Sequence, residues 1–332
     1  MIKFAAKRFV SMVLILLVLT AIVFLLQKLS NVNPAHAYLG ANASQAAIRH
    51  ETHVLGYDQP VLTQYVHYVR NLLDGNLGVS LRTRHPVATD LGVFLPATVE
   101  LAVTALVLAV LLGATFGLVS AARFRGAGAF RTLLLALASA PVFLLALLMI
   151  LWISGDLHLL PGTGDTGYAN APTGPTGMIV IDGLLHGQPA IAWDGVRHLI
   201  MPAIVVALGP AVSIGRVLRG SLEASMSSEF ARTARAKGLK ERTVVLRHAL
   251  RNSTSAALSM TGLQVGLMFA GVVVVETIFA WPGIGLYVDQ SIPQADFPAI
   301  AGVTLVLGVG YVVINTIVDI LQAVVDPRVT LE

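Results

Sequence analysis

The stretch Glu229-Phe-Ala-Arg-Thr-Ala-Arg-Ala-Lys-Gly238 lies between two apolar runs, Leu199–Leu218 and Thr254–Ala280. Each run has at least the roughly 20 residues that a helix needs to cross the hydrocarbon core of a bilayer. The stretch between them is basic and consists mostly of helix-forming residues. The sequence therefore predicts two membrane-spanning helices joined by a short polar helix outside the membrane.

Four further apolar runs extend this pattern over the whole chain. The 332 residues are 55% hydrophobic and only 12% charged, whereas average soluble domains are about 25% charged. A bilayer hides this much apolar surface directly, and backbone in contact with lipid must satisfy its own hydrogen bonds as helix. We predict an all-α integral membrane protein with six transmembrane helices. The six runs are Phe9–Leu26, Ala97–Ala122, Thr132–Ser154, Leu199–Leu218, Thr254–Ala280 and Ala299–Val325.

The distribution of basic residues predicts the orientation of these helices. Cytoplasmic loops carry an excess of Lys and Arg. An N-terminus in the cytoplasm places 16 of the 22 basic residues inside, including all nine from Arg216 to Arg251. Ten of the 18 acids then lie outside. Both termini are therefore expected in the cytoplasm, and the net charge of +4 reflects topology rather than nucleic-acid binding.

The first apolar run has two interpretations. Basic residues precede it and Ala35-His36-Ala37 follows it, as in a cleaved signal peptide. The run Phe9–Leu26 is longer than the usual apolar segment of such peptides, and the alanine pair begins nine residues past its end. A retained first helix is therefore favoured.

The predicted organisation has three parts. Residues 1–29 form the first transmembrane helix, residues 30–95 an extracytoplasmic subdomain, and residues 96–332 a five-helix core that includes the loop 220–252. Turns are expected in the subdomain at Gly75-Asn76 and Gly78. The second outer loop, Gly155–Arg197, is rich in Gly and Pro and is expected to be irregular. Proline inside a span can kink its helix, and Pro141, Pro202 and Pro210 occupy such positions.

The polar helix has its own start and stop signals. Ser227 and Ser228 precede Glu229, which gives a Ser N-cap and an acid in the first turn. Gly238 suits a left-handed C′ residue, and a second helix is expected through Glu241–Asn252. The small residues at 231, 234 and 236 would allow another protein to approach closely, and Arg232, Arg235 and Lys237 would add complementary charge. A basic loop held by anionic lipid headgroups explains the same residues, so both interpretations stay open on these residues alone.

The segment Glu229–Leu239, followed by Leu246-Arg-His-Ala-Leu-Arg-Asn252, resembles the EAA loop of ABC importer permeases. It is most similar to the peptide/nickel branch, the B subunits of dipeptide and oligopeptide permeases. Gly238 matches the pattern, whereas the triplet Arg232-Thr233-Ala234 matches only at its last residue and Arg251 replaces the terminal proline. Four other stretches resemble the same branch: Gly75–Arg82, Pro96–Leu101, Val275–Gly285 and Asp326-Pro-Arg328.

This resemblance implies a type I importer permease with the MetI-like fold. A second homologous permease subunit would pair with this chain, two cytoplasmic ABC ATPase domains would grip it, and an extracytoplasmic peptide-binding protein would deliver substrate. ATP and Mg would be bound by the partner subunits, with no cofactor on this chain. The ATPase-coupling residues would be Glu229, Phe230, Ala231, Arg232, Thr233, Ala234, Arg235, Lys237, Gly238 and Leu239.

A strip on the fifth span is predicted to line the interface between the permease subunits and the translocation path. Gly262, Gly266, Ala270 and Gly271 provide small residues there, and the strip bears Gln264. Glu276 is a candidate for the path or its outer gate, because an acid in a span is costly. For Glu100, three residues after the expected start of its helix, and for Asp319, a structural role is favoured.

Enzyme motifs are missing from the sequence. No Walker A pattern occurs, so ATP hydrolysis is not expected in this chain. His50-Glu51-Thr52-His53 has the wrong spacing for a zinc motif and is interpreted as a surface loop. An intramembrane hydrolase or a standalone channel is a less favoured class. The predicted cargo is a short peptide, with nickel or another small solute as the alternative; peptide length, side-chain preference and the residues that touch cargo are not decided by the sequence.

Overall fold

In a computed structural model of the chain, the described residues are 2–30, 39, 43–54, 56–121, 126–171 and 174–325. These residues contain helices and one isolated β-bridge, between Val79 and Pro86, but no strand. The chain divides into two compact units. Unit 1 consists of Met1–Phe4, Pro96–Gly285 and Tyr311–Glu332, and unit 2 consists of Ala5–Leu95 and Leu286–Gly310. Asp326-Pro-Arg328 and Ala35-His36-Ala37 lie outside the described residues.

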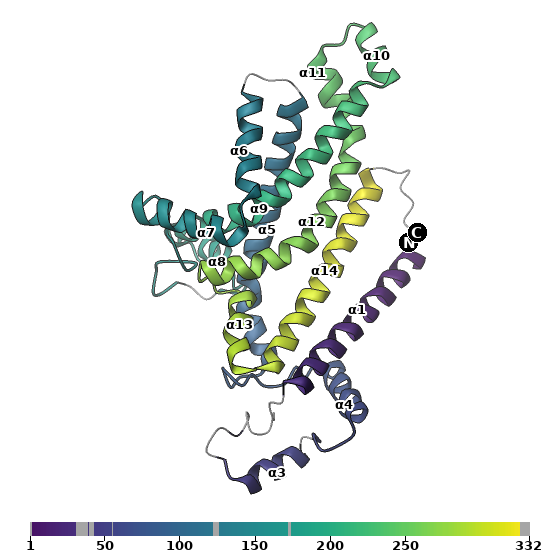
Figure 1. The fold of residues 1–332 in the computed structure, drawn as a ribbon. Coiled ribbons are helices and arrows are strands. Elements are labelled where there is room, and N and C mark those ends of the chain that lie inside the picture. Colours follow the sequence, from purple (N-terminus) through teal and green to yellow (C-terminus); the bar gives the residue numbers. More distant parts are fainter. Residues whose placement is uncertain are drawn as a thin grey trace. The chain divides into compact units, whose positions relative to one another are not determined.

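The helices contain most of each predicted apolar run, and Figure 1 shows the helices coloured along the chain. Two of them, α5 (Val87–Ala121) and α14 (Phe297–Val325), contribute to both units. Unit 2 also holds nearly all of α1 (Ile2–Leu29), with α3 (Gln45–Val54), α4 (Val61–Leu73), α13 (Ile284–Ser291, but for its first two residues) and the 3₁₀ turn η3 (Ile292–Gln294). The remaining helices belong to unit 1: α6 (Ala127–Ser139), α7 (Val142–Met149), η1 (Ile150–Asp156), α8 (Ile179–Leu185), α9 (Pro189–Met226), α10 (Glu229–Ala236), α11 (Glu241–Thr243), η2 (Val244–Ala249) and α12 (Leu250–Ile278).

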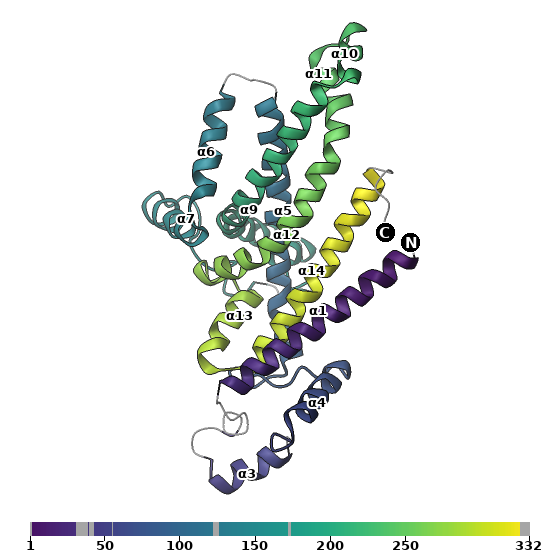
Figure 2. The same cartoon turned by 45° about the vertical axis from the view of Figure 1, so that its right-hand side comes forward.

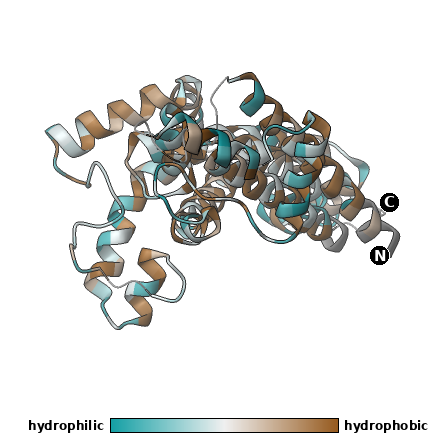
Figure 3. Cartoon of the chain, turned by 90° about the horizontal axis from the view of Figure 1, so that it is seen from below, coloured by the Kyte–Doolittle hydropathy of each residue, from teal (hydrophilic) through white to brown (hydrophobic). Residues whose placement is uncertain are grey.

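Five helices in the described residues are long and apolar enough to cross a membrane. They are Arg8–Leu29, Val87–Ser120, Pro189–Met226, Glu241–Ile278 and Phe297–Leu321. In Figure 3, brown marks the apolar residues, and it covers much of the helical ribbon. The second helix begins at Val87 rather than Ala97, because Pro96 is accommodated inside it. Glu100 therefore lies well within α5 and not near its first turn.

The third predicted span is not a straight helix. α6 ends at Ser139 and α7 begins at Val142, with a bend of 107° between them. Ala140 has an extended backbone (φ −73°, ψ 142°), as expected for a residue before proline, and Pro141 cannot donate the next helical hydrogen bond. The pair Gly128–Ser139 and Val142–Asp156 makes a sixth span only if it is counted as one broken element. By contrast, α9 continues through Pro202 and Pro210.

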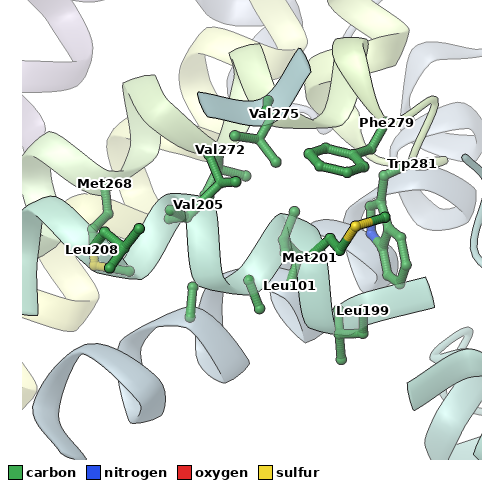
Figure 4. Close-up of a cluster of buried hydrophobic side chains, with 14 of the residues drawn as sticks. Leu101, Leu199, Met201, Val205, Leu208, Met268, Val272, Val275, Phe279 and Trp281 are labelled. Carbon is green, nitrogen blue, oxygen red and sulfur yellow. The ribbon is translucent and has the colours of Figure 1, made fainter. Parts of the chain in front are cut away.

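The core of unit 1 lies between α9 and α12, which run side by side in Figures 1 and 2. Figure 4 shows side chains from α9 facing those of α12. The residues that meet there include Met201, Val205, Leu208, Met268, Val272 and Val275. Trp281 closes one end of this cluster, fully buried, and its Nε1 donates to the Ala97 carbonyl at 2.8 Å. α5 is thereby tied to the segment that follows α12.

Glycines bring α5 close to α9. A Cβ on Gly113 would lie 2.9 Å from the Ala211 carbonyl oxygen, and one on Gly215 would lie 2.5 Å from the Phe116 ring. Real Cβ atoms do not approach so closely, so the two backbones touch only because both positions lack a side chain. The small-xxx-small motif at Gly113 and Gly117 therefore serves packing within this chain.

The second outer loop is more regular than its composition suggests. Its apolar segment Ile179–Leu185 forms α8, and α9 begins at Pro189, eight residues before Arg197. Asp182 accepts hydrogen bonds from the Thr176 backbone N–H (3.1 Å) and hydroxyl (2.8 Å), which fixes the approach to α8. The prediction of an irregular loop through Gly155–Arg197 was thus wrong for its second half, because Ile179 and Ile191 bury apolar surface there.

Unit 2 contains the expected turns and an unexpected helix. Gly75 and Gly78 have φ of 78° and 84°, which confirms the turns predicted from glycine. His50 and His53 lie in α3 rather than in a surface loop. The His53 Nδ1 lies 2.6 Å from an Asp58 carboxylate oxygen. No group of three His, Cys, Asp or Glu side chains suited to a metal occurs within the described part of the chain.

Candidate functional site

The predicted coupling segment forms a short helix, α10, beyond the adjoining ends of α9 and α12 (Figure 1). α9 ends at Met226, and Ser228 occupies the N-cap position with an extended backbone (φ −76°, ψ 162°). The Ser228 hydroxyl donates to the Ser225 carbonyl at 2.5 Å and caps no N–H of α10. The N-cap position is confirmed, whereas the hydroxyl contact expected there is replaced by one to α9.

Gly238 ends α10 as predicted. Its φ is 79°, in the left-handed region that favours glycine. The Gly238 N–H donates to the Arg235 carbonyl (2.9 Å), and the Leu239 N–H donates to the Ala234 carbonyl (3.3 Å). This pair of bonds is the Schellman arrangement. It turns the chain sharply into α11, so the path of the segment is fixed by local geometry.

One face of α10 is buried inside the chain itself. Ala231 and Ala234 pack with Val244 and Met226, and Ala231 has no exposed surface. These alanines therefore cannot be the surface that a partner approaches, and the interpretation based on small residues was wrong for these two positions. Their size serves instead to let α10 lie close to η2.

Arg235 also has internal partners. Its Nε and Nη2 donate to the two carboxylate oxygens of Glu241 at 3.0 and 2.9 Å, and its Nη1 donates to the Met226 carbonyl at 3.1 Å. The hydrogen bonds that Arg235 donates to the Glu241 carboxylate raise the pKa of Arg235. Arg235 thus joins the end of α9, α10 and the start of α11, and its guanidinium is not free to provide charge to a partner.

The outward face of α10 is polar with an aromatic side chain in it. Arg232 pairs with Glu229 one turn away (3.0 Å) and both are highly exposed. Phe230, Thr233 and Lys237 follow one another at helical spacing on the exposed side. Phe230 is 42% exposed and Leu239 39%. This face therefore offers two partly exposed apolar side chains beside charged ones to any protein that contacts α10.

Polar contacts anchor the start of α12 to the end of α9. The Asn252 side-chain nitrogen donates to the Ser225 hydroxyl oxygen at 3.3 Å, and the hydroxyls of Ser225 and Ser253 lie 3.2 Å apart. Ser225 and Ser253 are buried. α10 therefore stands on two long helices that are joined by a polar contact at its base.

The strip predicted on the fifth span does not form one surface. A Cβ on Gly262 would lie 2.8 Å from Val318, and one on Gly266 would lie 2.5 Å from the Tyr311 ring. Both glycines therefore face α14 of the same chain. Gln264 is two residues from each, roughly 200° around the helix, and lies on the opposite side. The expectation that these glycines line an intersubunit path was wrong, because the helical period separates them from Gln264.

Gln264 and Gly271 instead line a groove in unit 1 with a volume of about 380 Å³. Four helices form its walls: α6, α7, α9 and α12. Gln264 is only 7% exposed, whereas Gly271 has open space where a side chain would begin. The groove is mostly apolar, with Ser139, Ser213, Arg216 and Gln264 as its polar side chains. Its volume is in the range of small-molecule sites.

Glu276 is enclosed rather than exposed to a path. Its side chain is fully buried, and one carboxylate oxygen accepts the Gly285 N–H at 2.6 Å. A Cβ on Gly283 would lie 2.2 Å from the carboxylate. The turn after α12 therefore folds over Glu276, and Ile284 N–H continues it by donating to the Thr98 hydroxyl at 2.8 Å. These contacts make Glu276 an anchor of the turn after α12 rather than a side chain that lines a path, and its role at an outer gate stays a prediction.

The other two acids in spans differ in their surroundings. Glu100 is buried and accepts the Val180 N–H at 3.1 Å, which joins α5 to α8. This contact agrees with the structural role favoured for Glu100. The position expected for Glu100, near the start of its helix, was wrong, because α5 begins at Val87. Asp319 is half-buried on α14.

A polar cluster in unit 2 was missed by sequence reasoning. Asp296 is buried and accepts the Ser80 hydroxyl (2.5 Å) and the Arg82 N–H (3.1 Å). Asp90, also buried, accepts the Tyr287 hydroxyl at 2.8 Å, and burial raises the pKa of Tyr287. Ser80 and Arg82 belong to the motif Gly75–Arg82, but their partners lie more than 200 residues away and gave no local signal.

These features define an all-α membrane protein with a short helix held rigidly outside its long apolar helices. The chain belongs to the family of binding-protein-dependent transport system inner membrane components, whose model matches residues 109–331. The N-terminal model of binding-protein-dependent transport system membrane components matches residues 1–102. The chain is thus a permease subunit of a transport system and not an enzyme, and such systems include a binding protein and ATPase subunits.

Individual relatives align over nearly the whole chain. The probable D,D-dipeptide transport system permease protein DdpB of Escherichia coli is 37% identical over 96% of this chain and 94% of its own length. The dipeptide transport system permease protein DppB of Alkalihalophilus pseudofirmus is 35% identical over 99% of each. The di/tripeptide transport system permease protein DppB of Pseudomonas aeruginosa is 36% identical over 99% of each.

Proposed function

We propose that this chain is the transmembrane permease subunit of an ATP-driven ABC importer that moves di- and oligopeptides into the cytoplasm. The peptide cargo is supported by relatives that carry dipeptide or di/tripeptide transport in their names and align from end to end. The chain itself performs no covalent chemistry. It provides the path and receives mechanical work from its partners.

The coupling element in this proposal is the segment 229–239. The observation that supports it is the combination of a rigid attachment and an exposed face on α10. Ala231, Ala234 and Arg235 attach α10 to α9, α11 and η2, while Phe230 and Leu239 remain exposed. A partner that moves α10 would therefore move the ends of α9 and α12 with it. The segment acts as a two-state mechanical contact that responds to closure of the ATPases on ATP.

The proposed assembly has four kinds of component. A second homologous permease subunit pairs with this chain, two cytoplasmic ABC ATPase domains bind ATP and Mg, and an extracytoplasmic peptide-binding protein delivers the cargo. α10 and both termini lie in the cytoplasm, and residues 30–95 lie on the outer side. The excess of Lys and Arg in the loops assigned to the inside supports this orientation.

The test is co-purification and transport with the complete set of subunits. ATPase subunits are expected to co-elute with the wild-type chain, and an alanine scan across 229–239 is expected to find positions that weaken that association, above all the exposed apolar residues Phe230 and Leu239. Reconstituted transporter is then assayed with a panel of dipeptides, longer peptides and Ni²⁺. Uptake of Ni²⁺ but of no peptide would replace the peptide assignment by nickel. Normal uptake in every alanine variant would refute the coupling role.

The same experiment separates the other classes of protein. A standalone channel would conduct without ATP and would not need α10. An intramembrane hydrolase would cleave peptide without the ATPase subunits. ATP-dependent accumulation of intact peptide in the vesicle lumen is the outcome expected only for the importer.

A further inference from the structure

A second cavity continues the groove of unit 1 toward the α10 end of α9. Its volume is about 430 Å³, and it shares Leu135 and Arg216 with the first groove. The walls along α9 extend from Val205 to Glu223. At about 1.5 Å per residue this is a path of roughly 27 Å along one helix.

The two ends of this path differ in charge. Arg131, Arg216 and Arg219 line the second cavity, and Glu223 is the single acid in its wall. The Arg219 Nε donates to Glu223 at 2.8 Å, so that acid is already engaged. Within the described part of the chain, the guanidinium groups of Arg131 and Arg216 have no hydrogen bond and no ion pair. The second cavity therefore holds two guanidinium groups that form no ion pair with a carboxylate among the described residues.

The polar side chains in the apolar part of the path differ in whether they already have a hydrogen-bond partner. The hydroxyls of Ser139 and Ser213 donate to carbonyls of their own helices, at 2.6 and 3.2 Å. Gln264 has no such partner among the described residues, and its buried amide borders the groove. An amide and an arginine facing acyl chains would be costly. Their presence favours a groove that holds water and polar cargo rather than lipid tails.

We propose that Arg131 and Arg216 bind the C-terminal carboxylate of the transported peptide, so that the peptide leaves the groove with its carboxylate toward the α10 end. The inference rests on the peptide transport proposed above. A guanidinium binds a carboxylate through strong, charge-assisted hydrogen bonds, and the same positive charge repels the ammonium end of a peptide. Gln264 offers a donor and an acceptor to the peptide bond behind the carboxylate.

The test compares a dipeptide with its C-terminal amide, which lacks the negative charge. Complete transporter is reconstituted in vesicles of zwitterionic lipid, and the binding protein is saturated with either compound so that its own preference does not enter. The variant is Arg131→Gln with Arg216→Gln, which removes both charges and keeps the side chains polar. Arg70→Gln on α4, an exposed arginine outside the groove, is the matched control.

The wild type and the R70Q control are expected to import the free acid about tenfold faster than the amide, the ratio given by about 1.4 kcal/mol of preference. In the double variant, import of the acid falls to the rate of the amide, and import of the amide does not change. If the double variant does not assemble with the ATPases, R131Q and R216Q are measured singly, and each is expected to reduce the ratio.

Three results would overturn the proposal. One is an equal loss for acid and amide, which would assign the arginines to the fold. Another is a loss that is cancelled or produced by adding phosphatidylglycerol to the vesicles, which would assign them to lipid phosphate. The third is a wild-type ratio of one. Import of neither compound by an assembled wild-type transporter, with ATPase activity still stimulated by the binding protein, would instead refute peptide transport itself.

Discussion

At the scale of single residues, the position of a side chain on its helix determines which groups it contacts. Arg232 and Arg235 lie one turn apart on α10, but Arg232 pairs with Glu229 of its own helix while Arg235 contacts α9 and α11. An exposed i,i+3 pair contributes little to stability. A bidentate guanidinium that joins three elements fixes their relative geometry. The two arginines therefore have different expected roles despite the same residue type.

Substitution of Arg235 by Gln is expected to reduce ATP-driven transport several-fold while the ATPase subunits still co-elute, because α10 remains present but is less firmly attached to α9. Arg235→Lys keeps the charge without the bidentate geometry and is expected to behave similarly. Arg232→Gln removes the same charge from α10 without breaking a contact to α9 or α11, and it is the matched comparison that should reduce transport less. Equal losses in R232Q and R235Q, measured as peptide uptake per assembled complex, would contradict the assignment.

Gly266 and Gly271 lie on the same helix and make a second contrast. A side chain at Gly266 collides with Tyr311, whereas one at Gly271 enters the open groove. Gly266→Leu is expected to destabilise the chain by about 1–3 kcal/mol, the usual cost of overpacking, and Tyr311→Ala should recover part of it. Gly271→Leu should leave stability unchanged and slow transport by narrowing the groove. Thermal unfolding in detergent and uptake assays read the two effects separately; a stable G266L chain would count against the contact.

At the scale of elements, the sequence predicted the features that depend on neighbouring residues, such as the two ends of α10. The bounds of α10 follow from Ser228 and Gly238, and both positions were predictable because caps act within a few residues. The burial of Ala231 against Val244 was not, because it depends on how the chain returns after Gly238. Proline shows the same limit: Pro141 lies at a bend of 107° and Pro202 lies in a continuous helix, so the residue alone does not determine the outcome.

For the candidate site, the sequence predicted the segment 229–239 but not the groove. The segment 229–239 was found because its polarity and helix signals stand out between two apolar runs. The groove was found only in the structure, since Gln264 on α12, Leu135 on α6 and Arg216 on α9 are far apart in the sequence. Spacing along one helix could have separated Gln264 from Gly262 and Gly266, because residues two apart point to opposite sides.

The exposed face of α10 leads to a prediction for docking. Phe230 is the large aromatic side chain on this face, and truncation of the few residues that dominate an interface costs about 2 kcal/mol or more. Phe230→Ala is expected to weaken association with the ATPase subunits by at least about tenfold. Thr233→Ala, on the same face, is the control and should bind nearly normally. Association is measured by titrating purified ATPase subunits onto the immobilised permease, and unchanged binding of F230A would place the docking surface elsewhere.

At the scale of the whole molecule, the proposed orientation makes the two sides of the membrane chemically distinguishable. The sequence contains no cysteine, so one introduced thiol reports its own position without background. Thr233→Cys places a thiol on the exposed face of α10, and Leu73→Cys places one on α4, where Leu73 is 83% exposed. The first is proposed to face the cytoplasm and the second the outer side.

A membrane-impermeant maleimide is expected to label T233C only in inside-out vesicles and L73C only in right-side-out vesicles. In the complete complex, labelling of T233C should also fall when ATPase subunits are bound, because they cover α10, while labelling of L73C should not change. Opposite sidedness of both thiols would invert the orientation and remove α10 from reach of cytoplasmic ATPases. Labelling on the expected sides without protection of T233C by the ATPase subunits would support the topology but leave α10 facing solvent or lipid. Nucleotide turnover would then have to move α9 and α12 through other residues.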